Sequence, residues 1–148
     1  MTLRTACFAL LISSSVVSPV VLNAQPPAHE ETELGGKMDS LNSAFRKLRK
    51  QVTDATKNAE SLKLVAQMRS AVAESEKLVP TKAAEIAEAD REKFVAAYQA
   101  KLKEFDGKII ELEAALKADK NEEAAKILSA LGAMQKDGHK EFKKQEKH

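Results

Sequence analysis

The spacing of apolar residues constrains this chain more than any other feature. In four segments, apolar side chains recur in steps of three and four, which places them on one stripe of an α-helix. A helix with such a narrow stripe is not stable alone and needs neighbours that cover it. The stripes consist of Leu34, Met38, Leu41, Phe45, Leu48 and Val52; of Leu62, Val65, Met68, Val72 and Val79; of Phe94, Tyr98, Leu102, Phe105, Ile109, Leu112 and Leu116; and of Ala124, Leu128, Leu131, Gln135, His139 and Phe142.

The breaks between these segments are short, at about residues 53–60, 80–83 and 118–121. Ala, Leu, Lys and Glu dominate the sequence from residue 25 onward, which favours helix nearly throughout. Short connections between long helices force consecutive helices to run antiparallel. We therefore predict an all-α fold, an up-down-up-down antiparallel four-helix bundle. A coiled-coil oligomer, and three helices with the third segment split, are alternatives that the spacing leaves open.

The N-terminal residues predict an export signal. Arg4 is the only charge in residues 1–24, and an apolar run from Ala6 to Leu22 follows it. This pattern is typical of a secretory signal peptide, with cleavage expected after Ala24. A retained anchor is the alternative, but the interrupted run is shorter than the roughly 20 apolar residues that a membrane span needs. The predicted domains are a signal peptide, 1–24, and a helical domain, 25–148, with no span after cleavage.

Cysteine and charge exclude several functions. The one cysteine, Cys7, lies in the predicted signal peptide, so the mature chain has no disulfide and no thioether-attached haem. Without Arg4, the 24 basic residues become 23 against 22 acidic ones, interspersed along the sequence. This balance argues against nucleic acid as a partner. The C-terminal stretch 139–148 is locally basic; it could steer an acidic partner, or complement the dipole of the last helix.

Met38 and His139 are the candidate metal-ligating residues. In an up-down-up-down bundle, the first helix begins at the end where the fourth helix finishes. Met38 lies 16 residues before Asp54, and His139 lies 18 residues after Asn121, which is about 24 and 27 Å at the helical rise per residue. Both residues are on stripes that we predict to face inward. We therefore expect the two side chains at nearly equal height.

A thioether and an imidazole that face each other across a bundle suit the two axial positions of a haem iron. Gly138 and Gly132 remove side-chain volume near that level, as a flat macrocycle between helices requires. The alternative is that Met38 fills the core and that His139 is an ordinary helix-end residue. The remaining histidines and methionines lie at a terminus, at another height or on another face: His29, His148, Met68 and Met134.

The same end of the bundle is predicted to carry an apolar wall and nearby lysines. The wall consists of Leu41, Phe45, Val72, Val79, Phe94, Tyr98 and Phe142, and the lysines that could meet haem propionates are Lys140, Lys143 and Lys144. The sequence contains no paired Glu-x-x-His motif of a di-iron site, no Gly-rich phosphate loop, no His-rich zinc motif and no Ser-His-Asp arrangement. An enzyme is therefore not expected.

Three stretches resemble the cytochrome b562 family: KMDSLNSAFRKL around Met38, QMRSAVAESEKLVP at residues 67–80, and GAMQKDGHKEFKK around His139. The resemblance covers essentially the whole chain after the signal peptide. It implies a periplasmic four-helix bundle that binds one non-covalent b-type haem, with Met38 and His139 as the iron ligands. Two features depart from the family. Gln135 stands where an Arg is common, so propionate pairing is not implied there, and the interval from Met38 to Met68 is about a turn longer.

With both axial positions filled by protein, no position at the iron is left for oxygen or a substrate, so outer-sphere electron transfer is the expected function. Its partners would be redox proteins, which the sequence does not identify, and a monomer is expected. The rival hypothesis is a cofactor-free periplasmic bundle that acts as a binding or stress-related module. The abundance of Lys and Glu fits that hypothesis equally well.

Overall fold

The computed structural model describes residues 32–144; the predicted signal peptide, His29 and His148 lie outside this range. Four helices follow one another: α1 (Glu33–Leu48), α2 (Asn58–Ser75), α3 (Glu88–Lys117) and α4 (Asn121–Phe142). Short 3-10 helices, Ala55–Lys57 and Thr81–Glu85, lie in the first two connections. Helix α1 begins after Thr32, whose hydroxyl accepts a hydrogen bond from the Gly35 backbone N–H at 3.1 Å and so caps the first turn.

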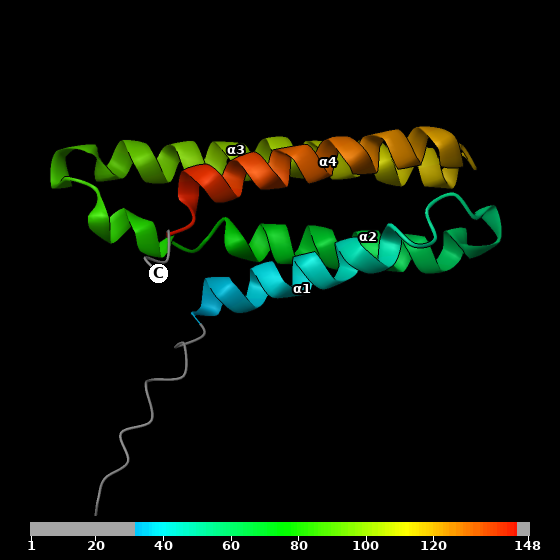
Figure 1. The fold of residues 1–148 in the computed structure, drawn as a ribbon, viewed down its shortest axis with the longest axis horizontal. Helices are drawn as coiled ribbons and strands as arrows, with labels where there is room; N and C mark the ends of the chain where they lie inside the picture. Colours follow the sequence, from blue (N-terminus) through cyan, green and yellow to red (C-terminus); the bar gives the residue numbers. More distant parts are fainter. Residues whose placement is uncertain (1–31, 145–148) are drawn as a thin grey trace, which may run out of the picture. The chain divides into compact units, whose positions relative to one another are not determined.

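Each helix packs against the one that follows it in the sequence, so that α1 lies beside α2, α2 beside α3, and α3 beside α4 (Figure 1). The prediction of an all-α up-down four-helix bundle is confirmed, and α3 is one unbroken helix of 30 residues rather than a split segment. Helices α1 and α4 come close at few points. The seam between them is therefore the least tightly packed side of the bundle.

The predicted stripes form most of the core. One cluster of buried side chains joins all four helices, and its fully buried large members are Leu48, Val65, Met68, Val72, Ile109, Leu112, Leu116 and Leu131. Leu34, Met38, Leu62 and Phe94 are only partly buried, packed against the edge of this cluster. Met68 has no exposed surface and fills the core, as a flexible thioether side chain often does.

The second connection differs from the prediction. Helix α2 ends at Ser75, and the chain re-enters a long helix only at Glu88, so this connection is longer than the predicted break at 80–83. Val79 lies in it with 58% of its surface exposed, and the prediction that it belongs to the apolar wall is wrong. Pro80 cannot donate a helical hydrogen bond, and the residue before a proline is biased away from helix, which favours this early end.

This connection is tied to the ends of α3 and α4. Arg91 Nε of α3 donates to the Ala83 carbonyl at 3.1 Å, and Lys82 Nζ donates to the Glu141 carbonyl. Lys144, just after α4, pairs with Glu85 at 2.9 Å. The connection thus holds the last turn of α4 in place.

At the other end of the bundle, two buried asparagines join the connections. Asn121 Nδ2, at the start of α4, donates to the Val52 carbonyl at 2.6 Å and to Asn58 Oδ1 at 2.8 Å. Asn58 Nδ2 donates to Asp119 Oδ1 at 2.8 Å, in the tight turn between α3 and α4 where Asp119 adopts a φ of 54°. Asp tolerates this left-handed conformation better than most residues do. These hydrogen bonds fix the heights at which α1 ends and α4 begins.

An aromatic cluster packs the end of α4 against α3. The Phe142 ring lies with its centroid 5.3 Å from that of Phe94 and 5.5 Å from that of Tyr98, the latter edge-on. Tyr98 is 4% exposed, and its hydroxyl donates to the Ser75 carbonyl at the end of α2, at 3.2 Å. Three helices therefore meet at this cluster, one turn beyond His139.

Within residues 32–144, no helix is both long enough and apolar enough to cross a bilayer.

We expect Tyr98 to titrate late. Burial, aided by the charge of Glu76, raises the pKa of Tyr98 from 10 to about 12. The folded state therefore keeps a proton that the unfolded state loses, so folding stability should fall as pH rises through this interval. The chain has one Tyr and no Trp, so ultraviolet absorbance of tyrosinate reports this group directly.

The measurement is an absorbance titration with helix content followed by circular dichroism in the same samples. A tyrosinate midpoint near 10 while the helices remain intact would contradict the buried placement of Tyr98. The Tyr98→Phe variant, which should show no tyrosinate signal, is the control.

Candidate functional site

Two contacts set the register between α1 and α4. Gln135 Nε2 of α4 donates to Asn42 Oδ1 of α1 at 2.5 Å, and one turn further along, a Cβ added at Gly132 would lie 3.5 Å from the Phe45 ring. In antiparallel helices, each step toward the N-terminus of one helix pairs with a step toward the C-terminus of the other. Four residues back from Asn42 is Met38, and four residues on from Gln135 is His139. This register places Met38 and His139 at the same height.

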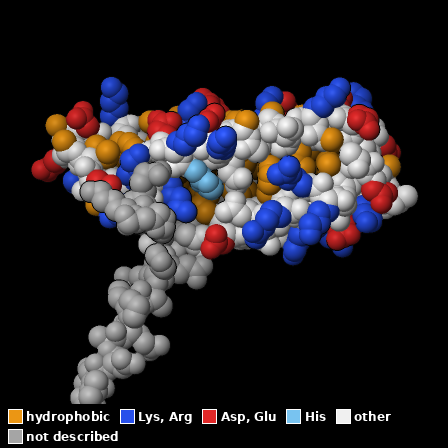
Figure 2. All heavy atoms as spheres, in the orientation of Figure 1, with side chains coloured by type: hydrophobic (Ala, Val, Ile, Leu, Met, Phe, Trp, Pro, Cys, Tyr) orange, Lys and Arg blue, Asp and Glu red, His pale blue; other side chains and the backbone are white. Residues whose placement is uncertain are grey.

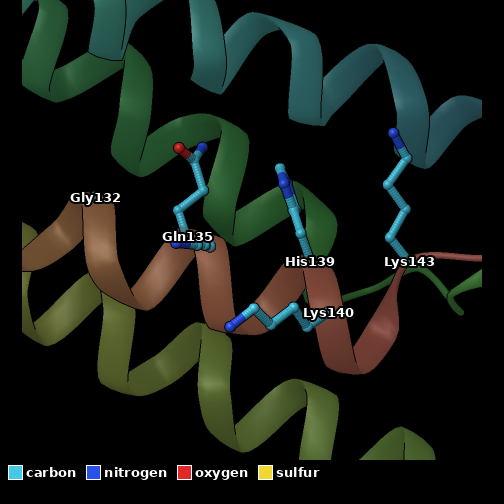
Figure 3. Close-up of a pocket in the computed structure, with 6 residues that line it drawn as sticks. Gly132, Gln135, His139, Lys140 and Lys143 are labelled. Atoms are coloured by element: carbon cyan, nitrogen blue, oxygen red, sulfur yellow. The ribbon is translucent and has the colours of Figure 1, made fainter. Parts of the chain in front are cut away.

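A hollow of about 410 Å³ lies beside His139. Its lining comes from one side of α4 and the residue that follows it: Gly132, Gln135, Lys136, His139, Lys140 and Lys143. Figure 3 shows Gln135, His139 and Lys143 extending from α4 in the direction of α1 and α2, whereas Lys140 lies along α4. The volume falls within the range of small-molecule sites, about 300–1,000 Å³.

The structure differs from the prediction in how far the two candidate ligands face inward. His139 is exposed at the hollow rather than buried in the core. Met38 is partly buried, packs against the core cluster, and is not among the residues that line the hollow. The two residues are thus brought to one height, but Met38 packs against the core cluster while His139 lies at the hollow.

The surroundings of His139 favour its neutral form. Partial desolvation lowers the pKa of His139, and the positive charge of Lys143 lowers it further. A neutral imidazole has a free nitrogen lone pair, which is the form that ligates a metal. At neutral pH the side chain is therefore available as a ligand without first losing a proton.

The glycines of α4 leave space where a flat group could lie. An added Cβ at Gly132, which lines the hollow, would make only an ordinary contact of 3.5 Å with the Phe45 ring, and one at Gly138, which does not line it, would meet nothing within 4 Å. Glycine inside a helix costs roughly 0.5–1 kcal/mol relative to alanine. Together with the exposed imidazole and the thioether at the same height, this open cradle fits a haem. The residues present therefore suit that cofactor.

A second hollow, of about 420 Å³, continues along the same seam and was not predicted from the sequence. Gly132 lines both hollows, and the second is bordered on the α1 side by Phe45, Arg49, Val52 and Thr53. Its signal in the sequence is the run of small residues Ala125, Ser129 and Gly132, spaced by four and three on α4. Small side chains at this spacing leave a shallow groove along one face of the helix.

The predicted lysines fall into two groups. Lys140 and Lys143 line the hollow, as does Lys136, which the prediction left out. Lys144 is paired with Glu85 and does not line the hollow. Gln135 is hydrogen-bonded to Asn42. Within residues 32–144, this is the only side-chain hydrogen bond between α1 and α4.

In the part of the chain that the structure describes, residues 32–144, no group of three or more His, Cys, Asp or Glu side chains is arranged to bind a metal ion.

Comparison with known proteins gives one match. The sequence model of the cytochrome b562 family matches residues 33–143, which extends from the first residue of α1 to the residue after α4. Met38, Gln135 and His139 all lie within the matched range. No curated protein and no solved structure matches the chain.

Two glycines that differ only in location provide a test of the cradle. Gly132 and Gly107 are both inside helices, and an added Cβ would make only an ordinary contact of 3.5 Å with Phe45 at Gly132 and meet nothing within 4 Å at Gly107. Each substitution to Ala should stabilise the apoprotein by roughly 0.5–1 kcal/mol, because the helix gains propensity. Urea unfolding of the two apo variants measures this gain.

Only Gly132→Ala should weaken haem binding, since its methyl group would occupy the hollow. Overpacking of this kind costs about 1–3 kcal/mol, or roughly fivefold or more in affinity. Haemin titrations of the two variants measure the difference, with Gly107→Ala as the matched control. Equal affinities in both variants would remove Gly132 from the binding surface.

Proposed function

This chain belongs to the cytochrome b562 family, and we propose that it is a small periplasmic electron-transfer protein that holds one non-covalent b-type haem between Met38 and His139. The family consists of electron carriers rather than enzymes. The prediction that this chain is not an enzyme is therefore confirmed by its family. The observation that carries the proposal is the register between α1 and α4. In this register the Met38 thioether and the His139 imidazole would stand at one height, with His139 at the border of the hollow.

Each ligand has a separate role in this proposal. His139 extends from α4 into the hollow and would bind iron through a ring nitrogen without losing a proton first. Met38, on α1, would bind from the opposite side through a weakly donating sulfur, which stabilises the reduced metal and raises the potential relative to two histidines. When bound, haem supplies a one-electron couple at its iron.

The packing of the protein around the site suits electron transfer rather than catalysis. Met38 packs against the core cluster, and the last turn of α4 is held by the Phe142 cluster and by the Lys82 contact to Glu141. A close-packed interior resists displacement of these groups when the charge of the site changes. With Met38 and His139 as ligands, a haem iron would have no position left for a substrate, so the site would serve electron transfer rather than catalysis.

Export is the second part of the proposal. Residues 1–24 have the pattern of a cleavable signal, and the family match begins downstream of them at residue 33. The protein recovered from the periplasm should therefore begin at Gln25, which an intact-mass measurement checks. A mass that still includes the apolar segment would indicate an anchor instead.

The exposure of His139 and the core contacts of Met38 favour one second candidate, a cofactor-free helical bundle that binds other proteins. In that case His139 is an ordinary residue near a helix C-terminus. Substitution of His139 by Leu would then be neutral or stabilising, and haemin would bind weakly and without saturation.

Haemin titration of the purified mature protein tests the proposal. The wild type should bind one equivalent and give the sharp, split visible bands of a six-coordinate low-spin haem after reduction. Met38→Ala should give a high-spin spectrum, because one axial ligand is lost, and His139→Ala should lose most of its affinity.

Met134→Leu is the matched control. Met134 is also a partly buried methionine packed on the core, but it lies five residues from His139 and therefore on another face of α4. Its spectrum should equal that of the wild type. A low-spin spectrum that survives in Met38→Ala would rule out Met38 as the sixth ligand.

A further inference from the structure

Three lysines border the hollow beside His139: Lys136, Lys140 and Lys143. Among residues 32–144, no carboxylate lies within 4.0 Å of the ammonium group of Lys136 or Lys143. Lys140 lies 3.6 Å from Asp137, but both side chains are more than two-thirds exposed, and a pair of this kind neutralises little. The α4 side of the seam therefore presents uncompensated positive charge.

The α1 side of the seam adds a second group of cations. Four of the five residues at positions 46–50 are basic, none is acidic, and all four are exposed: Arg46, Lys47, Arg49 and Lys50. Arg49 lines the second hollow, which shares Gly132 with the first. Figure 2 shows Lys and Arg side chains on both sides of the histidine. We call the four cations that line the two hollows, Arg49, Lys136, Lys140 and Lys143, the basic rim.

This charge is local. Helices α2 and α3 carry eight basic and nine acidic residues, and α1 and α4 carry six of each. The arginine of α2, Arg69, is paired with Asp106 at 3.0 Å and with Glu113 at 3.4 Å. The surplus of positive charge lies at positions 49–50 and 143–144, directly after α1 and α4, and Arg49 and Lys143 line the two hollows.

The number of cations exceeds what a haem needs. The propionates of a bound haem would pair with at most a couple of the lysines on the α4 side. The α1 cations and the rest of the α4 group would stay free. Positive charge around the exposed edge of a redox site attracts an anionic partner and orients it toward that edge.

We propose that the basic rim is the docking surface for an acidic redox protein. The inference rests on the proposed function, because it needs a haem edge at the hollow. A nucleic acid fits less well, since single-stranded binding surfaces carry exposed aromatic side chains for base stacking. The large hydrophobic residues that are exposed within residues 32–144 are Val79 and Ile110, neither of them aromatic. Contacts between a redox protein and its partner are transient and small, and contacts between charged surfaces weaken as salt is added.

Stopped-flow oxidation of the reduced, haem-loaded mature protein by ferricyanide tests this surface. Because ferricyanide is an anion, the rate should be high at low ionic strength and fall several-fold as salt is added. Poly-L-glutamate, which mimics an acidic protein surface, should inhibit the reaction at low salt.

The double variant Lys136→Glu with Arg49→Glu removes one cation from each side of the rim. It should lose most of the salt dependence and most of the inhibition. Lys63→Glu with Lys103→Glu makes the same change in net charge on α2 and α3, where both lysines are exposed, and should behave as the wild type does.

Haem loading of each variant is measured first, so that the two proposals fail separately. A chain that does not bind haem overturns both. A loaded chain that shows no salt dependence, or one in which both double variants change equally, overturns the docking surface alone. An oligonucleotide of equal charge that inhibits as strongly as poly-L-glutamate would indicate a general polyanion surface and overturn the assignment to a protein partner.

Discussion

The position of the candidate site depends on buried amide hydrogen bonds at the opposite end of the bundle. Asn121 and Asn58 connect the start of α4 to the end of α1 and to the turn between α3 and α4. Buried polar groups of this kind are costly unless they are paired, so they permit one arrangement of the connections and penalise others. Because these bonds fix where α1 ends and where α4 begins, the two helices keep their register without close packing between them.

Loose packing along the seam and tight packing elsewhere serve different purposes. Helices α2 and α3 supply most of the fully buried side chains, including Met68, Ile109 and Leu112. These side chains provide the stability that a bundle of this size needs. Small residues on α4 and the partly buried first turns of α1 leave room at the seam. A cofactor that enters there would displace few native contacts, and its edge would remain accessible to a partner.

Much of the fold could be predicted from the sequence because the core follows a regular spacing. Helix α3 illustrates this: its stripe is buried throughout, apart from the partly buried Phe94. Val79 continued the stripe of α2 by spacing alone, yet it lies beyond the end of the helix. A periodic pattern does not show where a helix ends. Pro80 disfavours helix in the residues before it, and α2 ends at Ser75.

The exposure of His139 has a similar geometric origin. From Leu131 the stripe advances by four residues to Gln135 and by four again to His139, and each such step turns about 40° around the helix. Leu131 is accordingly buried, Gln135 partly buried and His139 exposed, before Phe142 returns to the core. The equal height of the candidate ligands could be predicted from the number of residues in each helix. The direction in which each side chain points could not, because it depends on this accumulated rotation. The second hollow was missed because it arises from absent side-chain volume, which an apolar pattern does not reveal.

The single hydrogen bond between Gln135 and Asn42 has a kinetic consequence. It crosses the seam at the border of the hollow, one turn from His139, and the neighbouring glycines offer no bulk to close the seam further. Opening of this one bond would separate α1 from α4 at the hollow without unfolding the core. Access to the hollow would then be governed by a local opening rather than by global unfolding, so exchange of a bound group would be faster than unfolding of the bundle.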